Sequence, residues 1–379
     1  MQSKLASDLK PSETPSAVSL SCEPLFVPSL AALSLLDKVQ PLPPPPPPPS
    51  PPPLAVQPPP PPPAPLAVQP PPPPPQAVQP PPPPIPLARP SSANNTEVSI
   101  CSAIHDRVLH KDVAEKAYSQ VHQNSLLGGE NAQSDMCRYR FLSVYNPCTP
   151  MIQNGPRCGL VALVMAAELL GHKLSPDQVY QEAKTRGFTQ QGEMFSVTNM
   201  ASLCEGLSEI QTSVIDLVQD QCVLMAALLC GNPVLVPYDA DKNHQPCQKL
   251  GHKAHWTVLT GLFMKVRLDT VEHLMKSEGI QMVESDRFEC LYLIGPVTGT
   301  AAELLQGTTS GCNPEELWVY GHQGKSQHTA LWLLSDLIHS NGNLVEADPD
   351  KLTGPQKWVL PEGGLGEGLK DKGIVLQMR

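Results

Sequence analysis

The pattern of apolar and polar positions divides the chain into two unlike parts. Most of the prolines lie before residue 91, and there they leave no pattern from which a packed core could form. From about Glu97 onward, Leu, Val, Ala and Gly recur regularly among scattered charges. The residues from Leu160 to Leu170 are almost wholly apolar and predict a buried helix, with Gly171 as its stop. We therefore expect the packed core in the second part only.

Further elements follow from composition and from capping residues. Polar spacing indicates a helix from about Asp112 to Gln123, and Ser175-Pro-Asp-Gln is a typical start of another helix. Apolar and β-branched runs predict a helix over 222–230 and strands over 233–238, 255–263, 290–294 and 317–320. Because helices precede most of the strands, we predict an α+β fold in which a helical layer packs on an antiparallel sheet.

The first part of the chain, which we place at residues 1–96, is a proline-rich region. Of 379 residues 47 are proline, and the tract 41–90 is nearly all proline apart from repeated Ala-Val-Gln segments. Proline fixes φ and lacks an amide donor, so we expect this region to be disordered, with polyproline II conformation in the tract. The tract is either a stiff spacer or a docking strip for modules such as profilin, SH3, WW or EVH1.

Charge and cysteine usage exclude some classes of function. A net charge of −10 argues against a protein that binds nucleic acid, and no run of about 20 apolar residues predicts a membrane span. The 11 cysteines are irregularly spaced, and the N-terminal residues do not resemble a secretory signal. We therefore expect a cytoplasmic protein with free thiols, of which at most one is reactive.

One cysteine is notable because it lies at the start of the predicted apolar helix. Cys158 stands in Gly155-Pro-Arg-Cys-Gly-Leu, where free amides and the positive end of the helix dipole favour a thiolate. Gln153, shortly before it, could donate its side-chain amide to an oxyanion. His255 begins a predicted strand beside Trp256 and is the candidate general base. This order of glutamine, cysteine and histidine is that of papain-like cysteine peptidases.

The base and the group that orients it each have alternatives. His252 lies close to His255 in the sequence and could serve as the base instead. Papain-like enzymes orient their histidine with an asparagine from a later strand, and Gln323 occupies the corresponding place here. Asp239 and Asp241 are rival candidates for this orienting role. We predict Cys158, His255, Gln153 and Gln323 as the catalytic set.

A structural metal site is the main competing hypothesis for the region around the histidine. His244, Cys247, His252 and His255 fall within one short segment, and tetrahedral Cys/His sets commonly bind zinc. A single proline-containing loop would, however, have to surround the ion alone. We therefore expect no metal and no other cofactor, and we interpret the remaining cysteines as core residues or as residues without a role.

Together these motifs resemble those of the actin maturation protease family. The resembling segments are Gln153-Asn-Gly-Pro-Arg-Cys-Gly-Leu-Val-Ala-Leu, Gln191-Gly-Glu-Met-Phe-Ser-Val, Pro237-Tyr-Asp, Asn243-His-Gln-Pro-Cys-Gln, Gly251-His-Lys-Ala-His-Trp and Gly324-Lys-Ser. The resemblance extends from about Arg138 to Asn341. It implies a papain-like cysteine peptidase domain, which we place at 97–379, with a variable insertion at 265–314.

The resemblance also implies a function. It indicates a cysteine aminopeptidase that removes acetyl-Met or acetyl-Cys from the N-terminus of immature actin, with the proline tract recruiting profilin bound to actin. Cys158 would be the nucleophile and His255 the base by their places in matching motifs, whereas Gln153 follows only the general papain-like pattern. The alternative is a proline-rich adaptor or scaffold of the actin cytoskeleton with an inactive papain-like domain.

Overall fold

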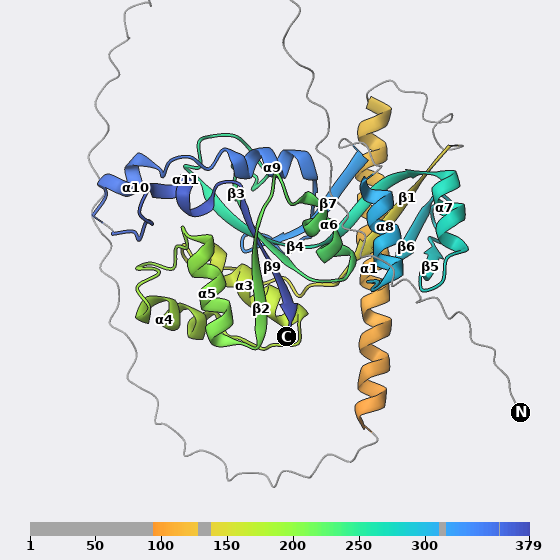
Figure 1. Ribbon diagram of the computed structural model, residues 1–379, viewed down its shortest axis with the longest axis horizontal. Helices are drawn as coiled ribbons and strands as arrows, with labels where there is room; N and C mark the ends of the chain where they lie inside the picture. The colour runs from red at the N-terminus through yellow and green to blue at the C-terminus, as the bar shows by residue number, and fades with distance from the viewer. Residues whose placement is uncertain (1–93, 128–137, 311–315, 356) are drawn as a thin grey trace, which may run out of the picture. The chain divides into compact units, whose positions relative to one another are not determined.

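The structure is a computed structural model that describes residues 94–127, 138–310, 316–355 and 357–379 (Figure 1). All of these residues belong to one compact unit, Ile85–Arg379. The proline tract 41–90 and nearly all of the region 1–96 lie outside the described residues, so the predictions made for them stay predictions. The described part is a mixed α+β fold, which confirms the class predicted from the sequence.

The centre of this fold is one sheet of nine strands within the described residues. They are β1 (Tyr139–Tyr145), β2 (Ile210–Asp216), β3 (Val234–Asp239), β4 (Ala254–Arg267), β5 (Met282–Glu284), β6 (Leu291–Ile294), β7 (Leu317–Gln323), β8 (Ala330–Leu333) and β9 (Lys372–Met378). The main path has the order β2-β9-β3-β4-β1-β6-β5, and β7 pairs with both β4 and β8. The pairing is antiparallel apart from the parallel pair β1 and β6. The sheet is therefore mainly, but not purely, antiparallel.

Helices pack around this sheet (Figure 1). They are α1 (Asn94–Leu127), α3 (Cys158–Leu169), α4 (Pro176–Thr185), α5 (Val197–Leu207), α6 (Gln221–Leu229), α7 (Leu268–Met275), α8 (Thr300–Ser310), α9 (Leu334–Gly342), α10 (Pro349–Thr353) and α11 (Gly364–Leu369). One apolar cluster joins α3, α4, α5 and α11 to the sheet, and a second joins α6, α7, α8 and α9 to it. A third cluster lies between α1 and strands β1, β6 and β7.

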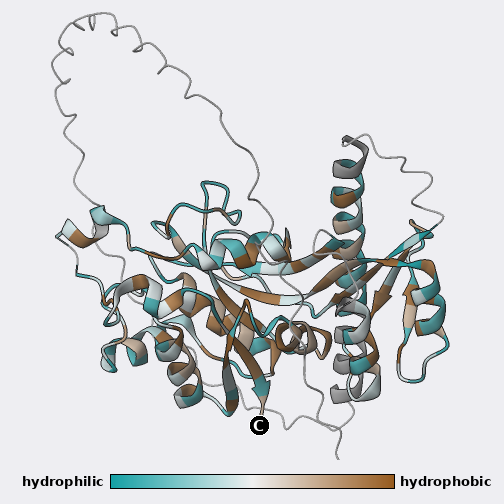
Figure 2. Ribbon diagram, turned by 45° about the horizontal axis from the view of Figure 1, so that its top comes forward, coloured by the Kyte–Doolittle hydropathy of each residue, from teal (hydrophilic) through white to brown (hydrophobic). Residues whose placement is uncertain are grey.

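Successive side chains of a strand point to opposite faces of the sheet, and this alternation separates the first two apolar clusters. In β3, Val234 and Val236 belong to the cluster of α6 to α9, whereas Leu235 between them belongs to the cluster of α3 to α5. Both faces of the central strands are therefore buried, and Figure 2 shows hydrophobic residues concentrated on these strands and on the helices against them. No helix in the described part is long and apolar enough to cross a bilayer.

The helix α3 is deeply buried and begins at Cys158. All residues from Gly159 to Ala167 are buried, as expected from their apolar composition. The helix stops as predicted: Gly171 has a φ of 80°, and the amides of Gly171 and His172 donate to the carbonyls of Glu168 and Ala167, each at 2.9 Å. At its start the N-cap residue offers no side-chain acceptor to the first amides. These amides remain available to the Cys158 thiol and to a substrate.

Most of the elements predicted from the sequence are confirmed with small shifts at their ends. The predicted helices correspond to α1, α3, α4 and α6, and the predicted strands to β3, β4, β6 and β7. Ser175 caps α4 by accepting from the amide of Gln178 at 3.1 Å, as its sequence indicated. The segment 265–314, predicted as a variable insertion, contains α7, β5, β6 and α8, and its strand β6 pairs with β1 in the sheet.

Candidate active site

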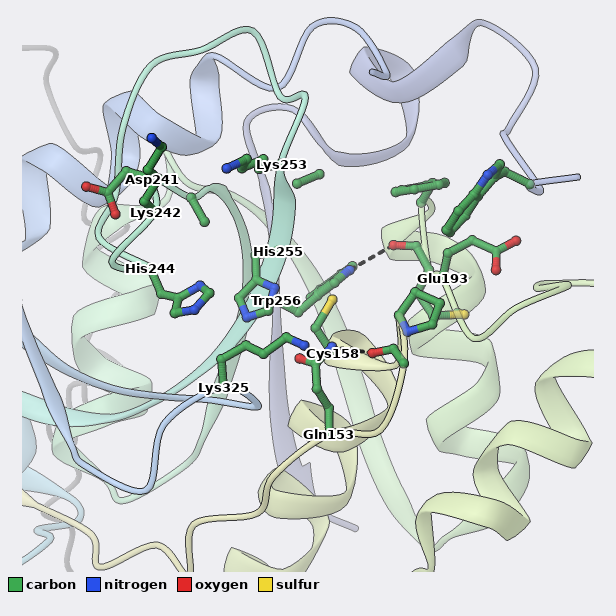
Figure 3. Close-up of a pocket in the computed structure, with 17 residues that line it drawn as sticks. Gln153, Cys158, Glu193, Asp241, Lys242, His244, Lys253, His255, Trp256 and Lys325 are labelled. Carbon is green, nitrogen blue, oxygen red and sulfur yellow. Dashed lines mark hydrogen bonds between the residues drawn. The ribbon is translucent and has the colours of Figure 1, made fainter. Parts of the chain in front are cut away.

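A cleft of about 400 Å³ opens where α3 begins (Figure 3). Gln153, Cys158 and His255 line this cleft, and so do Trp256 and Lys325. Small-molecule pockets in proteins usually measure about 300–1,000 Å³, so this cleft is at the small end of that range. It suits a short segment of a peptide better than a long one.

Cys158 is the first residue of α3, and its side chain is only partly buried. Burial raises the pKa of its thiol. The charge of His255, a hydrogen bond with His255 and the backbone amides of Trp256 and Gly159 lower that pKa more, so the net shift is downward. Each of these groups favours the thiolate over the thiol. Cys158 thus has the surroundings of a nucleophile.

Other cysteines in the described part differ from Cys158 in this respect. Burial raises the pKa of Cys148 to about 12 and that of Cys204 to about 11. Burial also raises the pKa values of Cys230 and Cys247. These four thiols stay protonated at neutral pH, and their surroundings give them no nucleophilic character.

His255 lies at the start of β4, where its backbone is paired with Tyr238 of β3. Its Nε2 is 3.1 Å from Oε1 of Gln323, which leaves Nδ1 for the hydrogen bond with Cys158. Burial lowers the pKa of His255, but the Cys158 thiolate, the hydrogen bond with it and the bond to Gln323 together raise that pKa above its ordinary value. A lowered pKa on Cys158 and a raised pKa on His255 favour a thiolate–imidazolium pair.

Gln323 is the last residue of β7 and is buried beside His255. Its Oε1 also accepts from the backbone amide of Lys325 at 2.7 Å. Two donors at one oxygen fix the amide with this oxygen toward the imidazole. Gln323 therefore stands where a group that fixes the tautomer of His255 is needed.

The alternative residues have other partners. Asp239 accepts from the backbone amides of Lys249 and Gly251. Asp241 lines the cleft, but its Oδ1 accepts from amides of the loop that follows it. His252 is not among the residues that line the cleft, and its Nε2 is 2.9 Å from a carboxylate oxygen of Glu346. In the part of the chain that the structure describes, no group of three or more His, Cys, Asp or Glu side chains is arranged to hold a metal.

Gln153 reaches the site from the irregular segment before α3. Its backbone amide donates to the carbonyl of Gly324 at 2.7 Å, and its Nε2 donates to the carbonyl of Gly155 at 2.6 Å. A side chain at position 324 would collide with that of Gln153, so the glycine permits this close approach. Figure 3 shows the Gln153 side chain extending toward Cys158. An oxyanion formed at Cys158 would compete with the Gly155 carbonyl for this amide.

Several residues of the cleft have no predicted catalytic role in the sequence analysis. Lys242, Lys253 and Lys325 line it with exposed side chains, and no ion pair joins them to a carboxylate within the described ranges. His244 has a φ of 61°, and its ring centroid is 5.6 Å from that of His255. Burial and the positive charge of His255 lower the pKa of His244. The only signal for Lys325 was its presence inside a recognised motif, and His244 was considered only as a possible zinc ligand.

Comparison with known proteins shows relatives along most of the chain. A family model described as actin maturation protease-like, C-terminal domain, matches residues 148–263, which include Cys158 and His255. An actin maturation protease of Xenopus tropicalis is 34% identical over 241 residues, which cover 62% of this chain and 73% of the relative. Those of Danio rerio (33% over 261 residues; 66% and 80% covered) and Mus musculus (35% over 279 residues; 70% and 71% covered) are similar in the same way.

Proposed function

We propose that this chain, which belongs to the actin maturation protease family, is a cysteine-type aminopeptidase that removes one acetylated residue from the N-terminus of actin. Actin is proposed as the substrate because the relatives are named actin maturation protease. The observation that carries the cysteine-type chemistry is the pair formed by Cys158 and His255, with a lowered pKa on the thiol and a raised pKa on the imidazole. An adaptor with an inactive domain would not require this pairing.

The chemistry follows from these two groups. The Cys158 thiolate attacks the carbonyl carbon of the acetylated residue, and the carbonyl oxygen takes up the negative charge. The amide of Gln153 and the free amides at the start of α3 stabilise this oxyanion. His255 gives its proton to the departing nitrogen as the C–N bond breaks, which frees the new N-terminus. Water, deprotonated by His255, then hydrolyses the thioester and releases the acetylated amino acid.

We extend the proposal to the architecture and the setting of the chain. Residues 97–379 would form a papain-like peptidase domain, because a nucleophile at a helix start faces a histidine on an antiparallel strand with Gln323 behind it. A cytoplasmic location suits the chain, since the seven cysteines whose side chains the structure describes are free. The three lysines of the cleft suit an acidic peptide, which is the class expected at the N-terminus of actin.

The proposed activity predicts a defined mass change in actin. Incubating the purified chain with actin that begins with acetyl-Met should lower the intact mass of actin by one acetyl-Met residue and no more. Actin that already lacks this residue is the control and should keep its mass. An unchanged mass of acetyl-Met actin, with the protein folded and its thiols reduced, would contradict the proposed function.

The proline tract is proposed to bind profilin, and its deletion tests this. Removing residues 41–90 should slow the cleavage of actin presented with profilin and spare that of a short acetylated peptide. A tether can raise the effective substrate concentration toward the millimolar range, and polyproline II is largely ordered before binding. The measurement is kcat/KM on both substrates for the full and shortened chains. Equal rates on profilin–actin would leave the tract as a spacer, and equal losses on both substrates would assign it to the fold.

A further inference from the structure

One end of the cleft is built from two segments joined by a buried carboxylate. Glu193 is only 3% exposed. It accepts from the hydroxyl of Thr189 at 2.8 Å and from the amides of Gln190 and Gln191 at 3.0 and 2.7 Å. It also accepts from the amide of Val359, 166 residues away, at 2.9 Å. A buried carboxylate with four donors holds its partners firmly, so Glu193 fixes Val359 beside the cleft.

The residue before Val359 is Trp358, which lines the cleft. Its ring centroid is 6.2 Å from that of Phe195, another residue of the lining. A second attachment follows at α11, where Gly368 approaches the carbonyl of Phe195 so closely that no side chain would fit between them. The segment that follows Trp358 is therefore attached at two points, with Val359 bound to Glu193 and Gly368 packed against the carbonyl of Phe195.

The two ends of the cleft differ in chemistry. Figure 3 places Glu193 on the opposite side of Cys158 from Lys242 and His244. The Glu193 end carries the aromatic side chain of Trp358, whereas the other end carries cations. We call the first the aromatic end and the second the lysine end. An apolar residue suits the aromatic end, and an acidic segment suits the lysine end.

We propose that Trp358 is a specificity-determining residue that closes the aromatic end of the cleft. One blocked apolar residue then fits between Trp358 and Cys158, while the rest of the peptide leaves by the lysine end. The inference rests on the proposed function and adds what the catalytic pair alone does not explain. A cysteine and histidine pair can cleave any peptide bond that reaches it. The number of residues removed from the N-terminus is therefore set by the shape of the cleft.

The test compares two acetylated peptides that share an acidic sequence. The short peptide begins with acetyl-Met, and the extended peptide carries two further residues before the same methionine. The wild-type chain should cleave the short peptide after methionine and leave the extended one intact. In the Trp358→Ala variant, kcat/KM for the extended peptide relative to the short one should rise about 10-fold or more. Product masses identify the bond that is cut.

Matched variants distinguish the loss of the Trp358 side chain at the aromatic end from a general loss of structure. Trp358→Phe keeps an aromatic ring and should keep the wild-type ratio. Leu352→Ala removes an exposed apolar side chain from α10 that does not line the cleft, and it should also leave the ratio unchanged. If thermal unfolding shows that Trp358→Ala does not fold, Trp358→Leu should shift the ratio in the same direction. A wild-type ratio in a folded alanine or leucine variant overturns the inference.

The outcomes for the inference and for the proposed function remain distinct. If a folded Trp358→Ala variant cleaves the short peptide and keeps the wild-type ratio, only the proposed role of Trp358 is contradicted. If the wild-type chain cleaves neither peptide, the proposed function fails. The proposed role of Trp358 is then tested by measuring how tightly each peptide binds. The Cys158→Ala chain should then bind the short peptide in preference to the extended one, and adding Trp358→Ala should remove this preference. Equal binding of both peptides to the Cys158→Ala chain would overturn the proposal that Trp358 closes the aromatic end.

Discussion

Replacing Cys158 with alanine should nearly abolish the processing of actin N-termini and leave the fold intact. Losing the nucleophile of a hydrolase typically costs on the order of 10⁶ in kcat, because no other group forms the covalent intermediate. The fold should persist, since alanine favours a helix and the side chain is only partly buried. The measurement is the rate at which acetyl-Met disappears from actin, with thermal unfolding of the variant beside it.

A matched control is available in Cys222, a partly buried cysteine in the first turn of α6 that does not line the cleft. Cys222→Ala should retain the wild-type rate. In addition, alkylation of the wild-type chain at mildly acidic pH should modify Cys158 ahead of Cys148 and Cys204, whose pKa values are raised. Acetyl-Met removal at a normal rate by Cys158→Ala would show that the nucleophile lies elsewhere.

Replacing His255 with alanine should lower kcat by roughly 10⁴–10⁶, because nucleophile and base act as a unit. The variant loses the general base and also the charge and hydrogen bond that lower the pKa of Cys158. Burial, which raises that pKa, is then opposed only by the backbone amides. The thiol of the variant should therefore be protonated at neutral pH, and raising the pH should restore part of the remaining rate. A pH–rate profile of the variant against the wild type checks both effects.

The nearby His252 provides the control for this prediction. His252 pairs with Glu346 on the partly exposed surface, so His252→Ala should change kcat only a few-fold. The double variant Cys158→Ala, His255→Ala should be no slower than Cys158→Ala alone, since the two residues serve the same step. A larger loss in His252→Ala than in His255→Ala would move the base to His252.

The parts of the fold that follow from local signals could be predicted from the sequence. The apolar run before Gly171 and the cap at Ser175 each involve neighbouring residues, and the structure has both. The order of the strands could not be predicted in this way. β9 pairs with β2 and β3, both far from it in the sequence, and no local pattern indicates such a partner.

The candidate site likewise contains some residues that local sequence signals indicate and others that depend on contacts between distant segments. Cys158 and His255 were found because each starts an element, and a helix start or a strand start is visible in the sequence. The sequence predicts Gln323 only by its correspondence to the asparagine of papain-like enzymes and leaves Asp239 and Asp241 as rivals. The contact of Gln323 with His255 depends on β7 pairing with β4, which sets Thr257 opposite Gln323. The position of Trp358 in the lining of the cleft could not be predicted, because it depends on the hydrogen bond between Val359 and Glu193, which are 166 positions apart.

The position of β9 also bears on how the protein is made. β9 lies between β2 and β3, yet the ribosome produces it after both and after the strand that carries His255. At about 5–20 residues per second, β2 and β3 emerge seconds before the strand that joins them. During that interval their edges are open to pairing with other nascent chains. A partly synthesised chain therefore contains Cys158 and His255 before the strand that joins β2 to β3 has been made.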